Sequence, residues 1–382
     1  MTTDEILTMA IYGILFVPAI ITPLCSCFFR MLLADKKSGG SSNNNATTPL
    51  SIIITAHDQG AELERNLPVL LSQAYKPGFE VIVVDESSTD NTDDVLTRLK
   101  SQYPNLYTTF IPSSSHYLSR RKLAITVGIK AAKNEWLILT DACCRPEHEN
   151  WLDIIACHCT ERNDIVLGYT GYEHQAGQFC CFEQLLTTCY FMRKAMTDTA
   201  YRYSGSNLAI RKSVFMEHNG FLRNLKYMRG EYDFLVNEYA TSGHTAVVTS
   251  KDAIMRQEVP SQRSWTNHHL YYMETRKHLQ RSLGYRALFN VDTTLLYANY
   301  ITQLMALLYG ISSGNVQLAS IAILCILLSF GMRIIVANKV AKRFGEHFSL
   351  PLIPLMELRV VWQNLWFMLR HRMADKYDFI RK

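Results

Sequence analysis

The chain has 382 residues, of which 48% are hydrophobic and 19% are charged. Its net charge of +5 is too small to indicate a nucleic-acid partner. The length accommodates one large domain with additional segments. The ten cysteines include no CxxC pair, so we expect reduced thiols in a cytoplasmic setting. A zinc site around Cys157, His158 and Cys159 is the alternative.

Residues 6–29 form a stretch of 24 residues without a charge. A helix needs about 20 apolar residues to cross a bilayer, so residues 1–34 are expected to form a transmembrane anchor. Two prolines within the stretch predict a kink or a re-entrant path. The basic residues that follow, Arg30, Lys36 and Lys37, favour a cytoplasmic C-terminal flank. A cleaved signal peptide is the alternative, although two acidic residues before the stretch argue against it.

Residues 35–48 include the sequence SGGSSNNNATT and are expected to be a flexible linker. In the segment that follows, 49–286, apolar runs alternate with helical patterns. The runs at 50–55, 80–84 and 136–140 predict parallel strands that are buried on both faces. Helical patterns lie between them, at residues 63–74, after a predicted cap at Asp90, and at 119–132. This alternation predicts an open α/β sheet with right-handed crossovers and flanking helices.

Residues 293–332 are a second uncharged stretch, of 40 residues, with a turn signal at 312–315. Two antiparallel spans fit this length, so residues 287–338 are expected to form a transmembrane helical hairpin. A buried helical hairpin in a soluble core is the alternative. Both ends of the proposed hairpin would lie on the same side of the membrane as the α/β domain.

The C-terminal part, residues 339–382, begins with Lys339 and Lys342, which again favour the cytoplasmic side. Its apolar residues are interrupted by charges and include Trp362 and Trp366. This pattern predicts an interfacial or membrane-associated helix and tail, with a third span as the alternative. The sequence as a whole predicts an integral protein of the inner or plasma membrane whose α/β domain faces the cytoplasm.

Acidic residues follow each of the three predicted buried strands. Asp58 follows the first strand, Asp85 and Glu86 the second, and Asp141 the third. In open α/β sheets, ligands bind outside the carboxyl ends of the strands. Carboxylates that crowd together there need a cation or hydrogen-bond donors, which a divalent metal and a nucleotide can supply. Each of these acids taken alone could equally be a turn or cap residue.

Several segments resemble, in the right order, motifs of the family 2 glycosyltransferases. They are IIITAHDQG (52–60), VIVVDESSTDNT (81–92), SRRKLAITVGIKAA (119–132), LILTDACCRP (137–146), SGSNLAIRKSVFMEHNGF (204–221) and RGEYDFLVNE (229–238). The second is similar to VIVVDDGSTDNT of the family and is the strongest match. The resemblance implies a GT-A-type domain that moves a sugar from a nucleotide-sugar donor to a lipid-linked or glycan acceptor by inverting displacement.

The resemblance also implies which residues bind the donor. They are Ala56, His57, Asp58, Asp85, Glu86, Lys122 and Asp141. Asp85 would accept a hydrogen bond from the base, and Lys122 would face the diphosphate. Asp141 would be the remaining half of a DxD pair that holds Mg²⁺ or Mn²⁺. The second aspartate of that pair is Cys143 here, and a thiol is a poor ligand for a hard cation.

The later motifs imply an acceptor side and a catalytic base. Gly205 and Asn207 would lie beside the acceptor, and Glu231 and Asp233 are the candidates for the acidic catalytic group. Tyr232 stands where the family usually has its base, and tyrosine is a weak base at neutral pH. A degenerate relative that binds nucleotide sugar or a partner without turnover is therefore an alternative hypothesis. A membrane transport component is another, which the large α/β domain and few spans disfavour.

Overall fold

The computed structural model describes residues 3–37, 47–113 and 119–375. The chain divides into two compact units. The α/β unit comprises Ser38–Gln280 and Trp366–Lys382, and the helical unit comprises Met1–Lys37 and Arg281–Leu365. Most of the predicted flexible linker, residues 38–46, lies outside the described residues.

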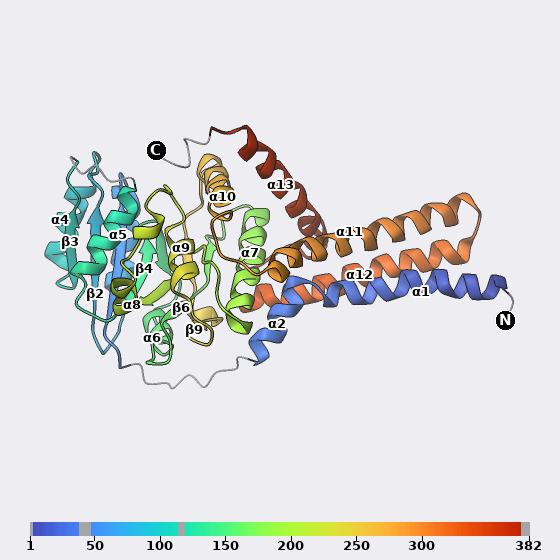
Figure 1. Cartoon of the computed structure of the whole chain (residues 1–382), viewed down its shortest axis with the longest axis horizontal. Coiled ribbons are helices and arrows are strands. Elements are labelled where there is room, and N and C mark those ends of the chain that lie inside the picture. The colour runs from blue at the N-terminus through green and yellow to red at the C-terminus, as the bar shows by residue number, and fades with distance from the viewer. Residues whose placement is uncertain (1–2, 38–46, 114–118, 376–382) are drawn as a thin grey trace. The chain divides into compact units, whose positions relative to one another are not determined.

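The α/β unit is built on a seven-stranded sheet in the order β3-β2-β1-β4-β8-β6-β9 (Figure 1). The strands are β1 (Leu50–Ala56), β2 (Phe79–Asp85), β3 (Leu106–Phe110), β4 (Trp136–Asp141), β6 (Ile165–Leu167), β8 (Leu208–Arg211) and β9 (Thr245–Val247). Strands β1 to β4 are parallel, and β8 is antiparallel to both of its neighbours. The predicted open, mostly parallel α/β sheet is therefore confirmed.

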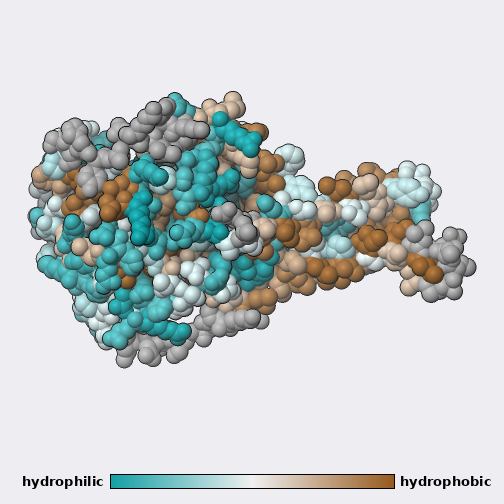
Figure 2. Space-filling view, viewed as in Figure 1, coloured by the Kyte–Doolittle hydropathy of each residue, from teal (hydrophilic) through white to brown (hydrophobic). Residues whose placement is uncertain are grey.

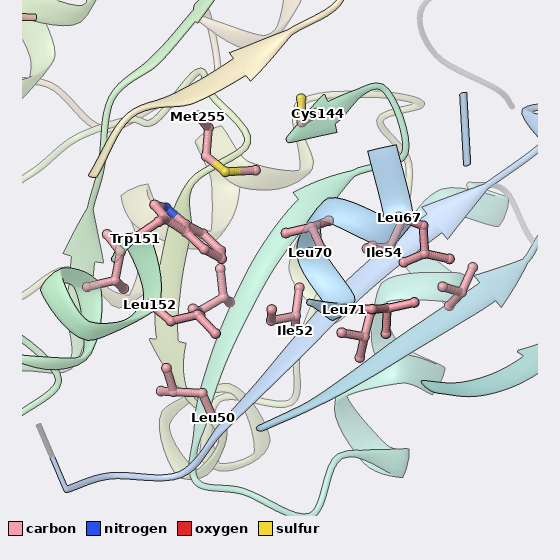
Figure 3. Packing of buried hydrophobic residues seen from close by; sticks show 14 of the residues in the cluster. Leu50, Ile52, Ile54, Leu67, Leu70, Leu71, Cys144, Trp151, Leu152 and Met255 are labelled. Atoms are coloured by element: carbon pink, nitrogen blue, oxygen red, sulfur yellow. The ribbon is translucent and has the colours of Figure 1, made fainter. Parts of the chain in front are cut away.

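Apolar residues are buried on both faces of the sheet, because successive side chains of a strand point to opposite sides. Leu50, Ile52 and Ile54 of β1 belong to a buried apolar cluster with residues of α3, Gly60–Leu71, and α4, Thr92–Gln102 (Figure 3). Every residue of β1 is buried. The apolar run was predicted to form a strand that is buried on both faces of the sheet, and this prediction is confirmed.

Helix α4 begins differently from the prediction. Its N-cap residue is Asn91, whose side chain makes no capping hydrogen bond. The Asp90 carboxylate instead accepts a hydrogen bond from the Thr92 N–H at 3.1 Å with one oxygen. Its other oxygen accepts from the Gly60 N–H at 3.0 Å. Asp90 thus joins the first turns of α3 and α4, which begin on neighbouring loops.

Smaller elements complete the α/β unit. A three-stranded sheet has the order β5-β10-β7 and consists of Cys144–Pro146, Met255–Gln257 and Thr170–Tyr172. Further helices are α6 (Trp151–Ala156), α7 (Gln178–Thr197), α8 (Lys212–Glu217), α9 (Glu231–Tyr239) and α10 (Gln262–Thr275), with short 3-10 turns at Leu222–Asn224 and Lys251–Ala253. Of these, α9 matters most for the site, because it starts beside the end of β4.

The helical unit contains α1 (Thr3–Leu24), α2 (Cys27–Lys37), α11 (Leu283–Ser312), α12 (Val316–Arg343), a 3-10 turn at Leu350–Leu352 and the first part of α13 (Ile353–Met373). A buried polar network joins three of these helices. Gln303 donates to the side chains of Asn299 and Ser329, at 2.9 and 3.2 Å. The Ser329 hydroxyl donates to the Ala19 carbonyl oxygen at 3.1 Å. Helices α1, α11 and α12 therefore pack around polar side chains.

The outer surface of this bundle is apolar. Exposed large side chains include Ile14, Val17, Leu304, Leu308, Leu324 and Leu327. Figure 2 shows apolar residues along much of the visible face of the bundle. In water, large apolar side chains gather inside a protein, whereas packed helices in lipid carry them outside and hydrogen-bond their polar groups to one another. The distribution is typical of helices that pack in a membrane.

Within the described ranges, one helix, Val316–Arg343, is long and apolar enough to cross a membrane. The pair Met9–Leu24 and Cys27–Asp35, which is bent by 50°, counts as a second if it forms one span. Pro18 and Pro23 lie inside α1, and the chain leaves the helix after Leu24. The N-terminal stretch is therefore broken into two helices, as the predicted kink or re-entrant path requires. Helix α11 is not among the helices that are long and apolar enough to cross a membrane.

Close packing on the second face of the sheet yields a prediction. A methyl group added at Gly128 of α5 (Arg120–Ala131) would lie 2.6 Å from Ile53 Cγ2 and 3.3 Å from Val84 Cγ2. Gly128→Val should therefore lower the free energy of unfolding by about 1–3 kcal/mol, the usual range for overpacking. Chemical unfolding of the purified protein measures this change. The matched control is Lys130→Ala, at an exposed position of the same helix, and equal stability of Gly128→Val and wild type would contradict the packing described.

Candidate functional site

The carboxyl ends of β1, β2 and β4 meet at one edge of the sheet. The strand register pairs Ala56 with Asp85 and Thr55 with Asp141. The Glu86 N–H extends the β1–β2 pairing with a hydrogen bond of 2.8 Å to the Ala56 carbonyl oxygen. The structure therefore brings together the three strand ends whose acidic residues we predicted to form a site.

Asp58 binds the loop after β1 to the loop after β2. Its carboxylate accepts hydrogen bonds from the Thr89 and Asp90 N–H groups at 2.6 and 3.3 Å. The bond from Thr89 lowers the pKa of Asp58. Asp58 and Ser87 both have positive φ, at 52° and 62°, a conformation that side chains other than glycine adopt at a cost. The His57 ring lies 3.7 Å from the Asp58 carboxylate, with about half of its side chain exposed.

Asp85 orders the loop that begins with it. Its two carboxylate oxygens accept hydrogen bonds from the Ser88 N–H at 3.1 and 3.2 Å, and Asp85 also accepts one from the Ser88 hydroxyl. The next residue, Glu86, is partly buried, and this burial raises its pKa. Arg120 stabilises the loop from α5 by donating to the Glu86 carbonyl oxygen and the Ser87 hydroxyl, at 2.7 and 2.8 Å.

Both carboxylate oxygens of Asp141 have hydrogen-bond partners from other elements. One oxygen accepts from Arg121 of α5 and, at 3.1 Å, from the Tyr232 hydroxyl of α9. The other accepts from the Ser206 hydroxyl at 2.6 Å. The ion pair between Arg121 and Asp141 is partly exposed, with 25% and 18% of the respective side chains accessible. Asp141 thus holds an arginine at the end of β4.

These residues do not fit the predicted Mg²⁺ or Mn²⁺. Hard cations need several oxygen ligands, and both oxygens of Asp141 already accept hydrogen bonds. The second position of the DxD pattern is Cys143, whose sulfur lies 3.8 Å from the Gln257 side-chain nitrogen. Among the residues that the structure describes, no three His, Cys, Asp or Glu side chains form a group that could hold a metal ion.

The alternative zinc site fails the same test over the described ranges. His158 and Cys159 instead bond to carbonyl oxygens of the preceding helical turn. The His158 ring contacts the Ile154 carbonyl oxygen at 2.9 Å, and the Cys159 thiol donates to that of Ile155 at 3.4 Å. Both side chains therefore form hydrogen bonds to carbonyl oxygens near the C-terminal end of α6.

Lys122 does not face the site, so its predicted role at the diphosphate is wrong. Its side chain is 0% exposed, and the ammonium donates to the carbonyl oxygens of Asn224 and Tyr227, both at 2.7 Å. Burial lowers the pKa of Lys122 to about 8. Successive residues of a helix differ by about 100° in direction, so Lys122 points into the protein while its neighbour Arg121 reaches Asp141.

Helix α9 separates the roles of three consecutive residues. It begins after Gly230, which has a φ of +89°. Tyr232 faces Asp141. Asp233 is buried and pairs with Arg202, whose Nε lies 2.9 Å from a carboxylate oxygen. The Asp233 carboxylate therefore neutralises a buried guanidinium, and its catalytic role stays a prediction.

Glu231 remains as the acidic candidate. Its residue is 6% exposed, and its buried Oε1 accepts no hydrogen bond from any residue the structure describes. It is near enough to Arg121 and Glu86 to influence the pKa of each. Tyr232 is no substitute, because burial and the charge of Asp141 raise its pKa far above the neutral range.

The predicted acceptor-side residues need correction. Asn207 is buried, and its side chain is fully used: it accepts from the Trp151 indole at 3.2 Å and donates to the Tyr169 and Ala253 carbonyl oxygens. Gly205 allows close packing, since a methyl group there would lie 2.7 Å from the Tyr203 hydroxyl. Neither residue offers a polar side-chain group to an acceptor. The intervening Ser206, which sequence reasoning missed, is the one that reaches Asp141.

The comparison with known families is consistent with this site. Residues 51–218 match the family described as Glycosyl transferase family 2. They are a family 2 glycosyltransferase domain. The match begins in β1 and ends just after α8, so it contains the Asp85 loop, Arg121 and Asp141, while α9 with Glu231 lies beyond it.

Individual relatives of this glycosyltransferase domain are distant. Glycosyltransferase AglE of Haloferax volcanii is 28% identical over 105 residues, which cover 27% of this chain and 33% of that protein. The match thus spans about a third of the relative's length.

The chain is also similar to solved structures. Mannosyltransferase PcManGT from Pyrobaculum calidifontis, solved with GDP-Man and Mn²⁺, is 15% identical, with a TM-score of 0.54 over 94% of this chain and 98% of that one. A fragment of S. aureus TarS in complex with UDP-GlcNAc is 11% identical, with a TM-score of 0.42 over 79% and 93% of the two chains. The first likeness confirms the GT-A-type α/β fold of the glycosyltransferase domain.

The buried pair of Arg202 and Asp233 yields a second prediction. Removing one partner of a buried ion pair leaves the other charge without compensation, at a cost of about 3–5 kcal/mol. Asp233→Ala should lower the free energy of unfolding by this amount, measured by chemical unfolding. The control is Asp94→Ala, which removes an exposed carboxylate from α4. An Asp233→Ala protein as stable as wild type would contradict the structural role of this residue.

Proposed function

We propose that this protein transfers a sugar from a nucleotide-sugar donor to an acceptor hydroxyl. The observation that carries the proposal is the meeting of three features around one sheet edge of a family 2 glycosyltransferase domain. They are the Asp85 loop, the two arginines of α5, and a Glu231 oxygen that has no hydrogen-bond partner among the described residues. Ligands of open α/β sheets bind at such an edge. The positive groups suit a diphosphate, and the loop offers polar groups for a base and ribose.

The donor nucleotide lies, in this proposal, over the loops that follow β1 and β2. Asp85 and the exposed His57 contact the base and ribose, while Asp58 holds the two loops in register. Arg120 and Arg121 lie at the start of α5, on the side where the diphosphate follows the ribose. The similarity in fold to a mannosyltransferase that binds GDP-Man makes GDP-mannose a reasonable first donor to test.

The transfer itself is proposed to be an inverting displacement. The acceptor oxygen forms a bond to the anomeric carbon as the bond from that carbon to the diphosphate oxygen breaks, and the electron pair leaves with the nucleoside diphosphate. A hydroxyl is a poor nucleophile, so a base must take its proton. Glu231 is the proposed base, because one of its carboxylate oxygens has no partner among the described residues. Asp233 is instead paired with Arg202, and burial raises the pKa of Tyr232.

The acceptor is proposed to be membrane-associated. The support is the helical unit, whose exposed side chains are apolar and whose polar side chains bond to one another inside. Basic residues flank the apolar segments at Arg30, Lys339, Lys342 and Arg343. By the positive-inside rule, these flanks lie in the cytoplasm. We therefore place the catalytic unit on the cytoplasmic side of the inner or plasma membrane, acting on a lipid-linked or other glycan acceptor.

A second candidate function is binding of a nucleotide sugar or partner without turnover. It is favoured by Tyr232 at the position of the family base and by Cys143 in the DxD pattern. The two candidates differ in whether nucleotide is released from the donor.

A donor screen separates these candidates. Purified full-length protein in detergent is incubated with UDP-, GDP- and dTDP-sugars and a membrane lipid extract, and released nucleotide and bound donor are both measured. The proposed activity predicts release that depends on the extract for at least one donor. Binding without release across the panel would support the non-catalytic candidate, and the absence of any binding would contradict both.

Glu231 provides the direct test of the base. Glu231→Gln should lower kcat by about 10²–10⁴, the usual contribution of a general base, while leaving the affinity for the donor near that of wild type. Steady-state kinetics and calorimetry measure the two quantities separately. Glu217→Gln, at an exposed position of α8, is the control. A Glu231→Gln enzyme with wild-type kcat would remove Glu231 from the reaction.

A further inference from the structure

Arg121 already lies where a metal-dependent site would need a cation. It donates to the carboxylate of Asp141, the residue expected to hold the metal. The Tyr232 hydroxyl and the Ser206 hydroxyl occupy the same carboxylate at 3.1 and 2.6 Å. A divalent ion on Asp141 would have to displace all three donors and lie next to a guanidinium of like charge. Like charges at such separations repel strongly where water is scarce.

The guanidinium of Arg121 retains hydrogen-bonding capacity beyond this ion pair. Its Nε–H is buried and has no hydrogen-bond partner among the described residues. A quarter of the side chain is exposed, so the group is accessible to a ligand at the strand ends. A guanidinium presents five N–H donors in a planar fork that matches the oxygens of a phosphate. One face of that fork can hold Asp141 while other donors remain for a second anion.

The surroundings hold this arginine in place. Asp141 is fixed at the end of β4 by the β1 pairing, and the ring of Tyr232 lies 5.6 Å from the guanidinium carbon. Arg120 is engaged differently, since it donates to the Glu86 carbonyl oxygen and the Ser87 hydroxyl. Lys122 is buried against other carbonyl oxygens. Of the three consecutive basic residues, Arg121 is therefore the one held by a carboxylate at the strand ends.

We infer that Arg121 takes the place of the divalent cation and binds the donor diphosphate directly, so that this protein binds nucleoside diphosphates without a metal. The inference rests on the proposed function. When the bond between the anomeric carbon and the diphosphate oxygen breaks, the negative charge that develops on the leaving diphosphate is stabilised by the N–H donors of Arg121. The proton of the acceptor hydroxyl still goes to Glu231. Asp141, Tyr232 and Ser206 are positioning residues for the arginine.

Calorimetry on the purified full-length protein tests this assignment. UDP, GDP and the nucleosides uridine and guanosine are titrated with EDTA present and, separately, with Mn²⁺. Wild type should bind a nucleoside diphosphate with the same affinity, within about twofold, under both conditions. Arg121→Ala should bind it roughly 10- to 150-fold more weakly, the equivalent of one hydrogen bond to a charged group, with unchanged affinity for the nucleoside. Lys130→Ala removes one exposed positive charge from the same helix and should behave as wild type.

A second variant tests whether a metal ion can replace Arg121 at the diphosphate. Arg121→Ala combined with Cys143→Asp releases the Asp141 carboxylate and adds the second oxygen ligand. Its affinity for the diphosphate should rise at least tenfold on addition of Mn²⁺, a response that wild type lacks. This variant also keeps the test valid if Arg121→Ala folds poorly, since Asp141 then has a metal to pair with.

Two outcomes would overturn the inference. Diphosphate binding by wild type that disappears in EDTA, with Arg121→Ala unchanged, would show a metal site and leave the proposed function standing, with Arg121–Asp141 a structural ion pair only. Binding of no nucleotide by wild type, with or without Mn²⁺, would overturn both the inference and the proposed function.

Discussion

The parallel pairing of β1 with β2 on one side and β4 on the other is the constraint on which the site depends. Parallel strands require long crossover connections, so α3 and α5 run back along the sheet and return each strand to the same edge. Three loops that are far apart in sequence therefore meet where β1, β2 and β4 end. Ala56 of β1 is paired with Asp85 of β2, and the preceding residue, Thr55, is paired with Asp141 of β4. This register brings the carboxylates of Asp85 and Asp141 to the same edge of the sheet.

Negative charge at that edge is balanced by side chains and backbone N–H groups of the same unit. Arg121 and the Tyr232 and Ser206 hydroxyls serve Asp141, while backbone N–H groups serve Asp58. Charge balance within the site is thus achieved by side chains and amides of the chain itself. Glu231 is the exception, because one of its buried oxygens has no partner among the described residues. In the proposed function this unsatisfied carboxylate is the group that takes a proton, and the satisfied groups hold the donor.

The sequence predicted strands β1, β2 and β4, the acids at their ends and the fold class, because apolar runs and family motifs are local signals. It failed where roles depend on helix phase or distant partners. SRRK contains three basic residues, and only the structure shows that Arg121 faces the site while Lys122 bonds to Asn224 and Tyr227. Asp233 looked catalytic because its partner, Arg202, lies 31 residues away. Asn207 was assigned to the acceptor side, but its side chain bonds to Trp151, Tyr169 and Ala253. Its neighbour Ser206 donates to Asp141 instead.

A structure of the protein with a bound nucleoside diphosphate, grown with Mn²⁺ and measured at the manganese absorption edge, tests the central claim most directly. The account predicts that the guanidinium of Arg121 lies within hydrogen-bonding distance of the diphosphate oxygens, still paired with Asp141, and that no anomalous signal lies between them. A manganese ion bridging Asp141 and the diphosphate, with Arg121 displaced from the carboxylate, would contradict it.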